Sequence, residues 1–118
     1  MQKHTKKSSR KKVAVLVGGP SLEHGVSLKS GEMVMMVLDK NKYDARIITI
    51  DKNGVWEVIP KDLKEHFDLA FIAMHGTYGE DGTVQSMLEG VGMPYTGSNA
   101  LVSALGMNKF LSLRLFSN

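Results

Sequence analysis

The sequence contains no cysteine, which excludes disulfide bridges, thiolate metal sites and cysteine nucleophiles. No apolar run approaches the roughly 20 residues of a membrane-spanning helix, and no apolar segment follows the charged start as a secretory signal would require. The 118 residues, 42% of them hydrophobic and 23% charged, are typical of one soluble globular domain and few for a complete multi-substrate enzyme. These features are compatible with a reducing cytoplasm and give no sign of a membrane partner.

Acidic residues are missing from the first twelve positions, which carry six lysines and arginines. Without those six, nine basic residues face twelve acidic ones, so the rest of the chain has a net charge of −3 rather than the +3 of the whole. A short basic tail can touch nucleic acid or anionic lipid. Because residues 1–12 lack periodicity, we interpret them as a disordered, solubilising end. A nucleic-acid partner would rest on this tail alone.

Several familiar catalytic signatures are also missing. The turn Gly18-Gly19-Pro20-Ser21-Leu22-Glu23 lacks the G-x-G-x-x-G pattern of dinucleotide-binding folds and is not a P-loop. There is no serine–histidine–aspartate spacing and no H-E-x-x-H motif. A nicotinamide-dependent dehydrogenase of the common kind is therefore disfavoured.

Residues 13–28, VAVLVGGPSLEHGVSL, organise the chain. The β-branched run 13–17 predicts a strand buried on both faces, and the glycine pair stops it. A helix is predicted over 25–39, and Gly31 inside it indicates close packing against the sheet, since a mid-helix glycine costs about 1 kcal/mol relative to alanine. Met33 is expected in the core. The expected core stripe of this helix is Val26, Ser30, Met33, Val34, Val37 and Leu38.

The remaining elements alternate between strand and helix. Strands are predicted at 45–50, 68–74 and 93–96, and helices at 83–90, 99–105 and 109–116. Asn53-Gly54 predicts an antiparallel hairpin that pairs 45–50 with 55–59, and Trp56 is expected to pack on it. Residues 60–67 are predicted as a polar connection with about one helical turn and an exposed His66. One face of the helix over 83–90 is expected to carry Val84, Met87, Leu88 and Val91.

This order predicts a three-layer α/β/α sandwich with a mainly parallel sheet. The turns over 18–25 and 75–83 would open at the same edge of the sheet, where ligands bind in such folds. That edge is the predicted site.

The residues in those turns indicate what the site could hold. Glycines and a helix N-terminus favour a carboxylate or phosphate, whereas Glu23 favours a cation, so together they suit an amino acid. Glu23 could equally be a helix-start carboxylate, and both readings stay open. His75 ends a buried strand, which makes it a candidate for chemistry. The adjacent acids Glu80 and Asp81 are assigned to helix entry, so no metal site is predicted.

Three stretches carry a resemblance to a known family. The first stretch, GGPSLEHGVSL over 18–28, resembles the N-terminal signature of the D-alanine–D-alanine ligases. The second, HGTYGEDGTVQ over 75–85, is similar to the second signature of this family. YTGS over 95–98 and ALGMNK over 104–109 resemble the third. The resemblance covers residues 13–116 in order and spacing, with two departures: Gly25 stands where the family usually has an acidic residue, and Asn108 stands where aspartate is common.

The resemblance implies an ATP-grasp enzyme of three domains that phosphorylates the carboxylate of one D-alanine and joins a second D-alanine to it. Residues 13–118 would be its N-terminal, Rossmann-like pre-ATP-grasp domain. It implies that Glu23 anchors the ammonium of the first D-alanine, that Val26 and Ser27 line its site, and that His75 lies near the reacting carboxylate. Gly76 would shape the loop beneath the substrates. Lys109 would lie toward the ATP phosphates.

The resemblance further implies ATP and Mg²⁺ as cofactors of the full-length enzyme, a role in peptidoglycan synthesis, a bacterial cytoplasmic location and a homodimer. Because the central and C-terminal domains would follow Asn118, we expect this chain to be an N-terminal fragment that is inactive alone and binds no metal. Two alternatives stay open: the same domain of a D-alanine–D-lactate or D-alanine–D-serine ligase, and a stand-alone, non-catalytic module that binds a small amino acid.

Overall fold

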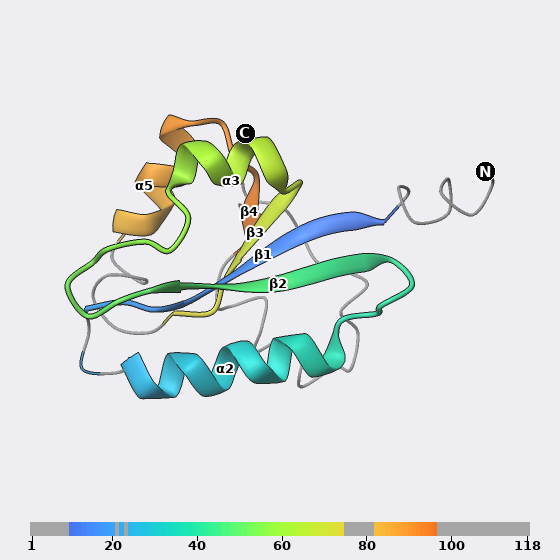
Figure 1. Cartoon of the computed structure of the whole chain (residues 1–118), viewed down its shortest axis with the longest axis horizontal. Helices are drawn as coiled ribbons and strands as arrows, with labels where there is room; N and C mark the ends of the chain where they lie inside the picture. The colour runs from blue at the N-terminus through green and yellow to red at the C-terminus, as the bar shows by residue number, and fades with distance from the viewer. Residues whose placement is uncertain (1–9, 21, 23, 75–81, 97–118) are drawn as a thin grey trace.

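The computed structural model describes residues 10–20, 22, 24–74 and 82–96. Within these ranges strands and helices alternate along the chain, and helices cover both faces of a single sheet (Figure 1). The predicted three-layer α/β/α architecture is therefore confirmed. The elements in chain order are β1 (Lys11–Gly18), α2 (His24–Val37), β2 (Tyr43–Ile50), α3 (Pro60–His66), β3 (Leu69–Ile72), α5 (Thr83–Gly90) and β4 (Tyr95–Thr96).

The sheet has the strand order β2-β1-β3-β4, and every neighbouring pair is parallel. Val13 of β1 is in register with Ala45 of β2 on one side and with Leu69 of β3 on the other. Since β1 lies between two strands and beneath helices on both faces, a continuous apolar run suits it. Residues 13–17 are accordingly at most 1% exposed.

Alternate side chains of β1 enter two separate cores. Val13, Val15 and Val17 pack on the side of α2, together with Phe71 of β3. Ala14 and Leu16 point to the opposite face, where α3 and α5 lie (Figure 1). The core on that second face also contains large side chains: Trp56, Leu63, Met74, Leu88, Met93 and Tyr95.

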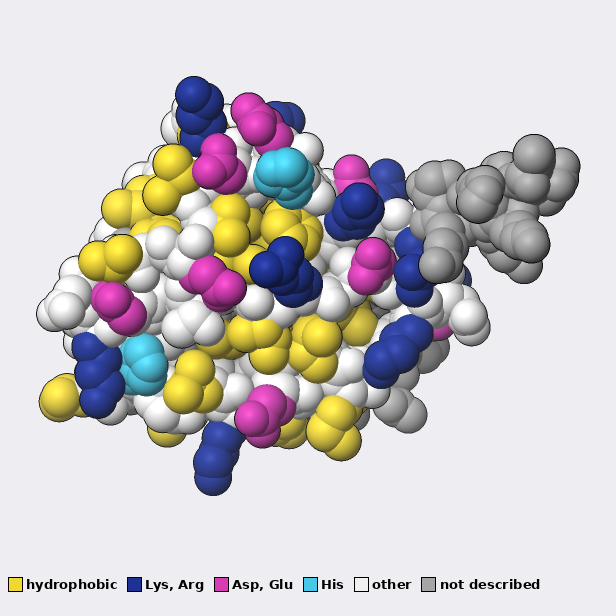
Figure 2. All heavy atoms as spheres, in the orientation of Figure 1, with side chains coloured by type: hydrophobic (Ala, Val, Ile, Leu, Met, Phe, Trp, Pro, Cys, Tyr) yellow, Lys and Arg dark blue, Asp and Glu magenta, His cyan; other side chains and the backbone are white. Residues whose placement is uncertain are grey.

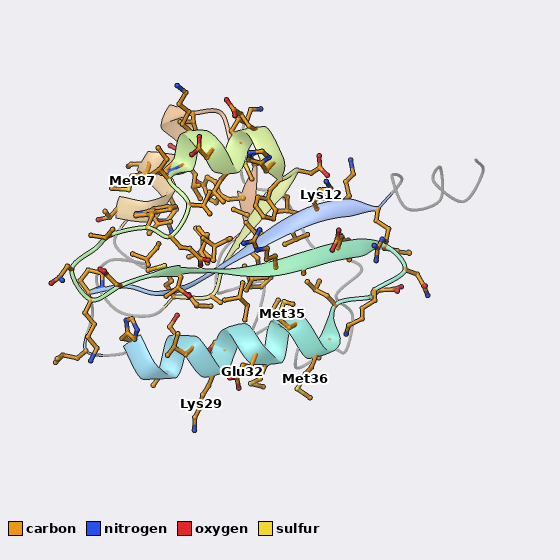
Figure 3. All side chains as sticks on the ribbon, in the orientation of Figure 1. Lys12, Lys29, Glu32, Met35, Met36 and Met87 are labelled. Atoms are coloured by element: carbon orange, nitrogen blue, oxygen red, sulfur yellow. The ribbon has the colours of Figure 1, made fainter. Side chains whose placement is uncertain are left out.

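Helix α2 forms close to its predicted bounds, but the predicted core stripe is partly wrong. Val34 and Leu38 are buried as expected, whereas Met33 is 44% exposed and Val26 is 54% exposed. The buried face instead includes two small residues, Ser27 and Gly31. Figure 3 shows Lys29, Glu32 and Met36 pointing away from the sheet, while Met35 points toward it.

Gly31 explains why small residues form this face. A β-carbon at Gly31 would lie 2.3 Å from Cγ1 of Val17, so the helix backbone contacts the sheet more closely than any larger side chain would permit. The prediction that Gly31 marks close packing is confirmed. Hydropathy favours Met33 for the core, whereas the close approach of helix and sheet leaves room only for Gly31.

The predicted hairpin after β2 is only partly formed. The turn exists: Asp51 Oδ1 accepts hydrogen bonds from the N–H groups of Asn53 and Val55, and Gly54 has φ +83°. Beyond it, the described residues show a single antiparallel bridge, Ile50 with Trp56, instead of a second strand. The prediction of a strand over 55–59 is wrong because Pro60 starts helix α3 directly after this bridge.

Other local predictions have clear outcomes. Trp56 is 8% exposed and belongs to the core, as predicted, and His66 is exposed. Helix α5 forms over the predicted residues, although Met87 of its expected apolar face is 40% exposed. The helix over 60–66 is longer than the single turn expected. The predicted loop over 75–81 and the helices over 99–105 and 109–116 lie outside the described residues.

Candidate functional site

The carboxyl ends of β1 and β3 define the candidate site. The two strands are parallel neighbours, so both end at the same edge of the sheet. Pairing continues one residue past β3, because the N–H of Ala73 donates to the carbonyl of Leu16 at 2.9 Å. The segments that follow Gly18 and Met74 therefore start from one edge, as the sequence predicts.

The turn after β1 depends on its glycines. Gly18 and Gly19 have φ of +95° and +91°, a left-handed conformation that other residues rarely adopt. A β-carbon at Gly18 would also lie 2.3 Å from the carbonyl oxygen of Ile50. The N–H of Gly19 donates to that same oxygen at 2.7 Å, which ties the turn to the end of β2.

His24, the first residue of α2, holds the other side of this turn. Its Nδ1 lies 2.7 Å from the carbonyl oxygen of Gly19. Because a carbonyl oxygen can only accept, this contact requires the proton to sit on Nδ1. The sequence places His24, with Glu23 and Ser27, among the polar residues where a ligand would lie, and the structure shows its ring on the carbonyl of Gly19.

Ser27 lies one turn further along α2 and is fully buried. Its Oγ accepts a hydrogen bond from the N–H of Gly18 at 2.8 Å and donates one to the carbonyl of Ala73 at 2.7 Å. The hydroxyl thus links α2 with the ends of β1 and β3. Its neighbour Val26, also predicted as a site residue, is half-exposed.

The other predicted site residues cannot be compared with this geometry. Glu23, His75, Gly76 and Lys109 lie outside the described residues. Thr96, which was not predicted, ends β4 and is fully buried, and its Oγ1 has no hydrogen-bond partner among the described residues. Across the same described part of the chain, no group of three or more His, Asp or Glu could hold a metal ion.

A separate hollow lies at the opposite end of the strands. Its volume is about 470 Å³, and it opens between the amino end of β2 and the carboxyl end of α3. Figure 2 shows this face, on which apolar side chains remain visible among charged ones. At about 3.3 Å per strand residue, Lys12 in this hollow is about 20 Å from Gly18 at the candidate site. The lining residues are Lys12, Asp44, Arg46, Val58, Glu65, His66 and Phe67.

Of the helices in the described ranges, none is both long and apolar enough to span a membrane.

The sequence matches the family model described as "D-ala D-ala ligase N-terminus" over residues 12–66 and 57–98. It is 49% identical over 106 residues to the D-alanine–D-alanine ligase of Geotalea uraniireducens. The matched region covers 90% of this chain and 33% of that protein. The chain therefore spans about a third of the length of the curated relatives it matches.

Solved structures agree with the sequence comparison. The VanG D-Ala:D-Ser ligase of Enterococcus faecalis superposes with a TM-score of 0.65 and 28% identity, over 78% of this chain and 37% of that one. The Bacillus anthracis D-alanine–D-alanine ligase complexed with ATP superposes with a TM-score of 0.59 and 42% identity, over 73% of this chain and 28% of that one.

Proposed function

We propose a function from one premise: the chain belongs to the D-Ala–D-Ala ligase N-terminus family. It is the N-terminal domain of a D-alanine–D-alanine ligase, and the full enzyme joins two D-alanines at the expense of ATP. The ATP-bound relative from Bacillus anthracis supports the nucleotide. By family analogy the dipeptide serves peptidoglycan synthesis in the cytoplasm, and the enzyme is a homodimer.

In the proposed reaction, the carboxylate of one D-alanine takes the terminal phosphoryl group of ATP, and the amine of the second D-alanine displaces phosphate from the resulting acyl phosphate. The task of this domain is to hold and orient the first D-alanine. Glu23 binds its ammonium, His75 and Gly76 lie near its carboxylate, and Val26 supplies an apolar wall. Lys109 reaches toward the ATP phosphates.

One observation carries this assignment of the site. The ends of β1 and β3 lie side by side, and the Ser27 hydroxyl bonds to both of them. The turn that carries Glu23 and the segment that carries His75 therefore begin at one place. Magnesium is expected in the full enzyme, but the described residues contain no cluster that fits it, so we assign no ligand and no reaction step to a metal here.

A second candidate function is supported by the likeness to VanG. That relative is a D-Ala:D-Ser ligase, and its fold matches this chain as well as those of the D-alanine–D-alanine ligases do. The first D-alanine is common to both reactions. The domain described here would fit either enzyme, and the dipeptide that the full enzyme forms would distinguish the two functions.

A chimeric enzyme tests the proposal. Residues 12–98 replace the matching segment of the Geotalea uraniireducens ligase, and phosphate release is measured with ATP, Mg²⁺ and D-alanine. We expect D-alanine-dependent activity, D-alanyl-D-alanine as the product, and a loss of at least 100-fold on Glu23→Ala. In a second assay that also contains D-serine, its incorporation as the second residue in preference to D-alanine would favour the second candidate. A folded chimera without activity would contradict the ligase proposal.

A further inference from the structure

One hydroxyl joins the two strand ends from which the proposed substrate turns begin. Gly18 is the last residue of β1, and Ala73 directly follows β3. The Ser27 hydroxyl accepts from the N–H of Gly18 at 2.8 Å and donates to the carbonyl of Ala73 at 2.7 Å. Residues 18 and 73 are far apart in the sequence, and this contact adds to the backbone hydrogen bond from Ala73 to Leu16 in holding the two strand ends together.

The same hydroxyl is poorly suited to bind a substrate directly. A serine hydroxyl has a single proton to donate, and Ser27 gives this proton to Ala73. The side chain is also 0% exposed, so a soluble ligand does not reach the oxygen in this conformation. A substrate carboxylate, which needs a donor, would find none at Ser27.

The turn itself is held from both sides. Besides the contact of Gly18 with Ser27, the N–H of Gly19 donates to Ile50 and the carbonyl of Gly19 accepts from His24. Each of these contacts is 2.7–2.8 Å long. Of these contacts, only that of Ser27 also reaches the residue that follows β3, because the partners of Gly19 lie on β2 and α2.

We propose that Ser27 is a positioning residue: it sets the distance between the turn that carries Glu23 and the segment that follows Met74, without touching the substrate. This assigns Ser27 a different role from the substrate contact that the family resemblance implies. The identity of the substrate rests on the proposed ligase function. The coupling of the two strand ends through Ser27 does not depend on it.

The coupling is tested on the ligand-free chain with Ser27→Ala. We expect at least tenfold faster hydrogen exchange at the Gly18 amide and NMR shift changes at Gly19, Ala73 and Met74. Ser86→Ala is the matched control, because Ser86 is exposed on α5, and it should leave these amides unchanged. If Ser27→Ala does not fold, Ser27→Cys replaces it, since the weaker thiol should move the same amides less. Unchanged signals at Ala73 and Met74 would overturn the coupling.

The functional arm uses the chimeric ligase. Ser27→Ala should raise the KM for D-alanine about tenfold while the KM for ATP stays within twofold. Destabilisation alone would lower kcat through a smaller folded fraction and leave KM unchanged, which would contradict positioning. A raised KM for D-alanine without any change in the amide signals would indicate direct substrate contact and overturn the proposal. If the amide signals change but the chimera has no ligase activity, the proposed function is refuted and the coupling stands.

Discussion

The two faces of the sheet are closed in different ways, although β1 and β3 supply side chains to both. On one face α2 lies so close to β1 that no β-carbon fits between Gly31 and Val17. On the other face α3 and α5 pack over a layer of large side chains that includes Trp56, Met74 and Met93. Packing on the first face depends on small residues that let the helix approach the sheet, and packing on the second face depends on the volume of large side chains.

This difference separates the kinds of substitution that each face tolerates. A close helix–sheet contact should be sensitive to added atoms, because a rigid backbone and a β-branched valine have little freedom to move. A face filled by Trp and Met should be sensitive to removed atoms, because each large side chain leaves a large cavity. Substitutions of the same type on opposite faces can therefore test whether the two faces differ in this way.

The largest effect is expected from Trp56→Ala on the α3 and α5 face. Trp56 is 8% exposed, and its removal should cost about 3–5 kcal/mol of unfolding free energy because the cavity is too large to collapse. Urea unfolding measures this loss. Val55→Ala, at a neighbouring residue that is 62% exposed, should change stability by less than about 0.5 kcal/mol. Equal losses for the two variants would refute the role of Trp56 as a volume-filling residue.

Two valines of α2 test which side of this helix contacts the sheet. Val34 is fully buried and Val37 is 39% exposed, although both stand in the stripe expected from the sequence. Val34→Ala should cost about 2 kcal/mol, since burying a valine side chain contributes about 1.5–3 kcal/mol. Val37→Ala should cost less than about 0.5 kcal/mol. Thermal and urea unfolding of the pair would contradict the observed face if Val37→Ala were the more harmful change.

Two glycines of α2 test the closeness of the contact. Gly31→Ala should gain about 1 kcal/mol from helix propensity but lose about 1–3 kcal/mol from overpacking against Val17, for a net loss of about 1 kcal/mol. At Gly25 nothing lies within 4 Å of the added β-carbon. Gly25→Ala should therefore stabilise the chain by about 0.5–1 kcal/mol.

A double-mutant cycle supplies the control for Gly31. Val17→Ala removes the methyl group that the new β-carbon would strike, so Gly31→Ala should be less harmful in that background. We expect the two changes to differ from additivity by at least about 0.5 kcal/mol. Additive losses would mean that Val17 does not limit the approach of the helix.

The fold was largely predictable because its strongest signals are local. The apolar run 13–17 and the glycine turn after it predicted β1 and the start of α2, and alternating elements predicted parallel pairing. The buried face of α2 was not predictable in the same way. Hydropathy favours Val26 and Met33 over Ser27 and Gly31, whereas the distance between helix and sheet decides the outcome, and that distance is a tertiary property.

The site was predictable only in its position. Parallel strands that end at one edge follow from the topology, so the adjacent ends of β1 and β3 could be expected. The two hydrogen bonds of Ser27 could not, because a contact between residues 27 and 73 has no signature in the local sequence. The roles of Glu23 and His75 stay predictions that rest on the family resemblance.

The last expected effect lies at the rim of the α5 face and depends on pH. Tyr95 donates a hydrogen bond to Glu89, and this bond, with burial and the nearby carboxylate, raises the pKa of Tyr95 to about 12. Because the pKa is higher in the folded state than the usual value of 10, the stabilising contribution is complete below pH 10 and disappears as the pH rises toward 12. The contacts of the Ser27 hydroxyl on the α2 face involve no comparable titration.

Tyr95→Phe isolates this contribution. The unfolding free energies of the parent and the variant should differ by a constant amount below pH 10 and converge between pH 10 and 12, which urea unfolding across this range would show. Lysines titrate in the same interval, but their effect is common to both proteins and cancels in the difference. A difference that stays constant up to pH 12 would mean that the Tyr95–Glu89 contact does not hold the proton.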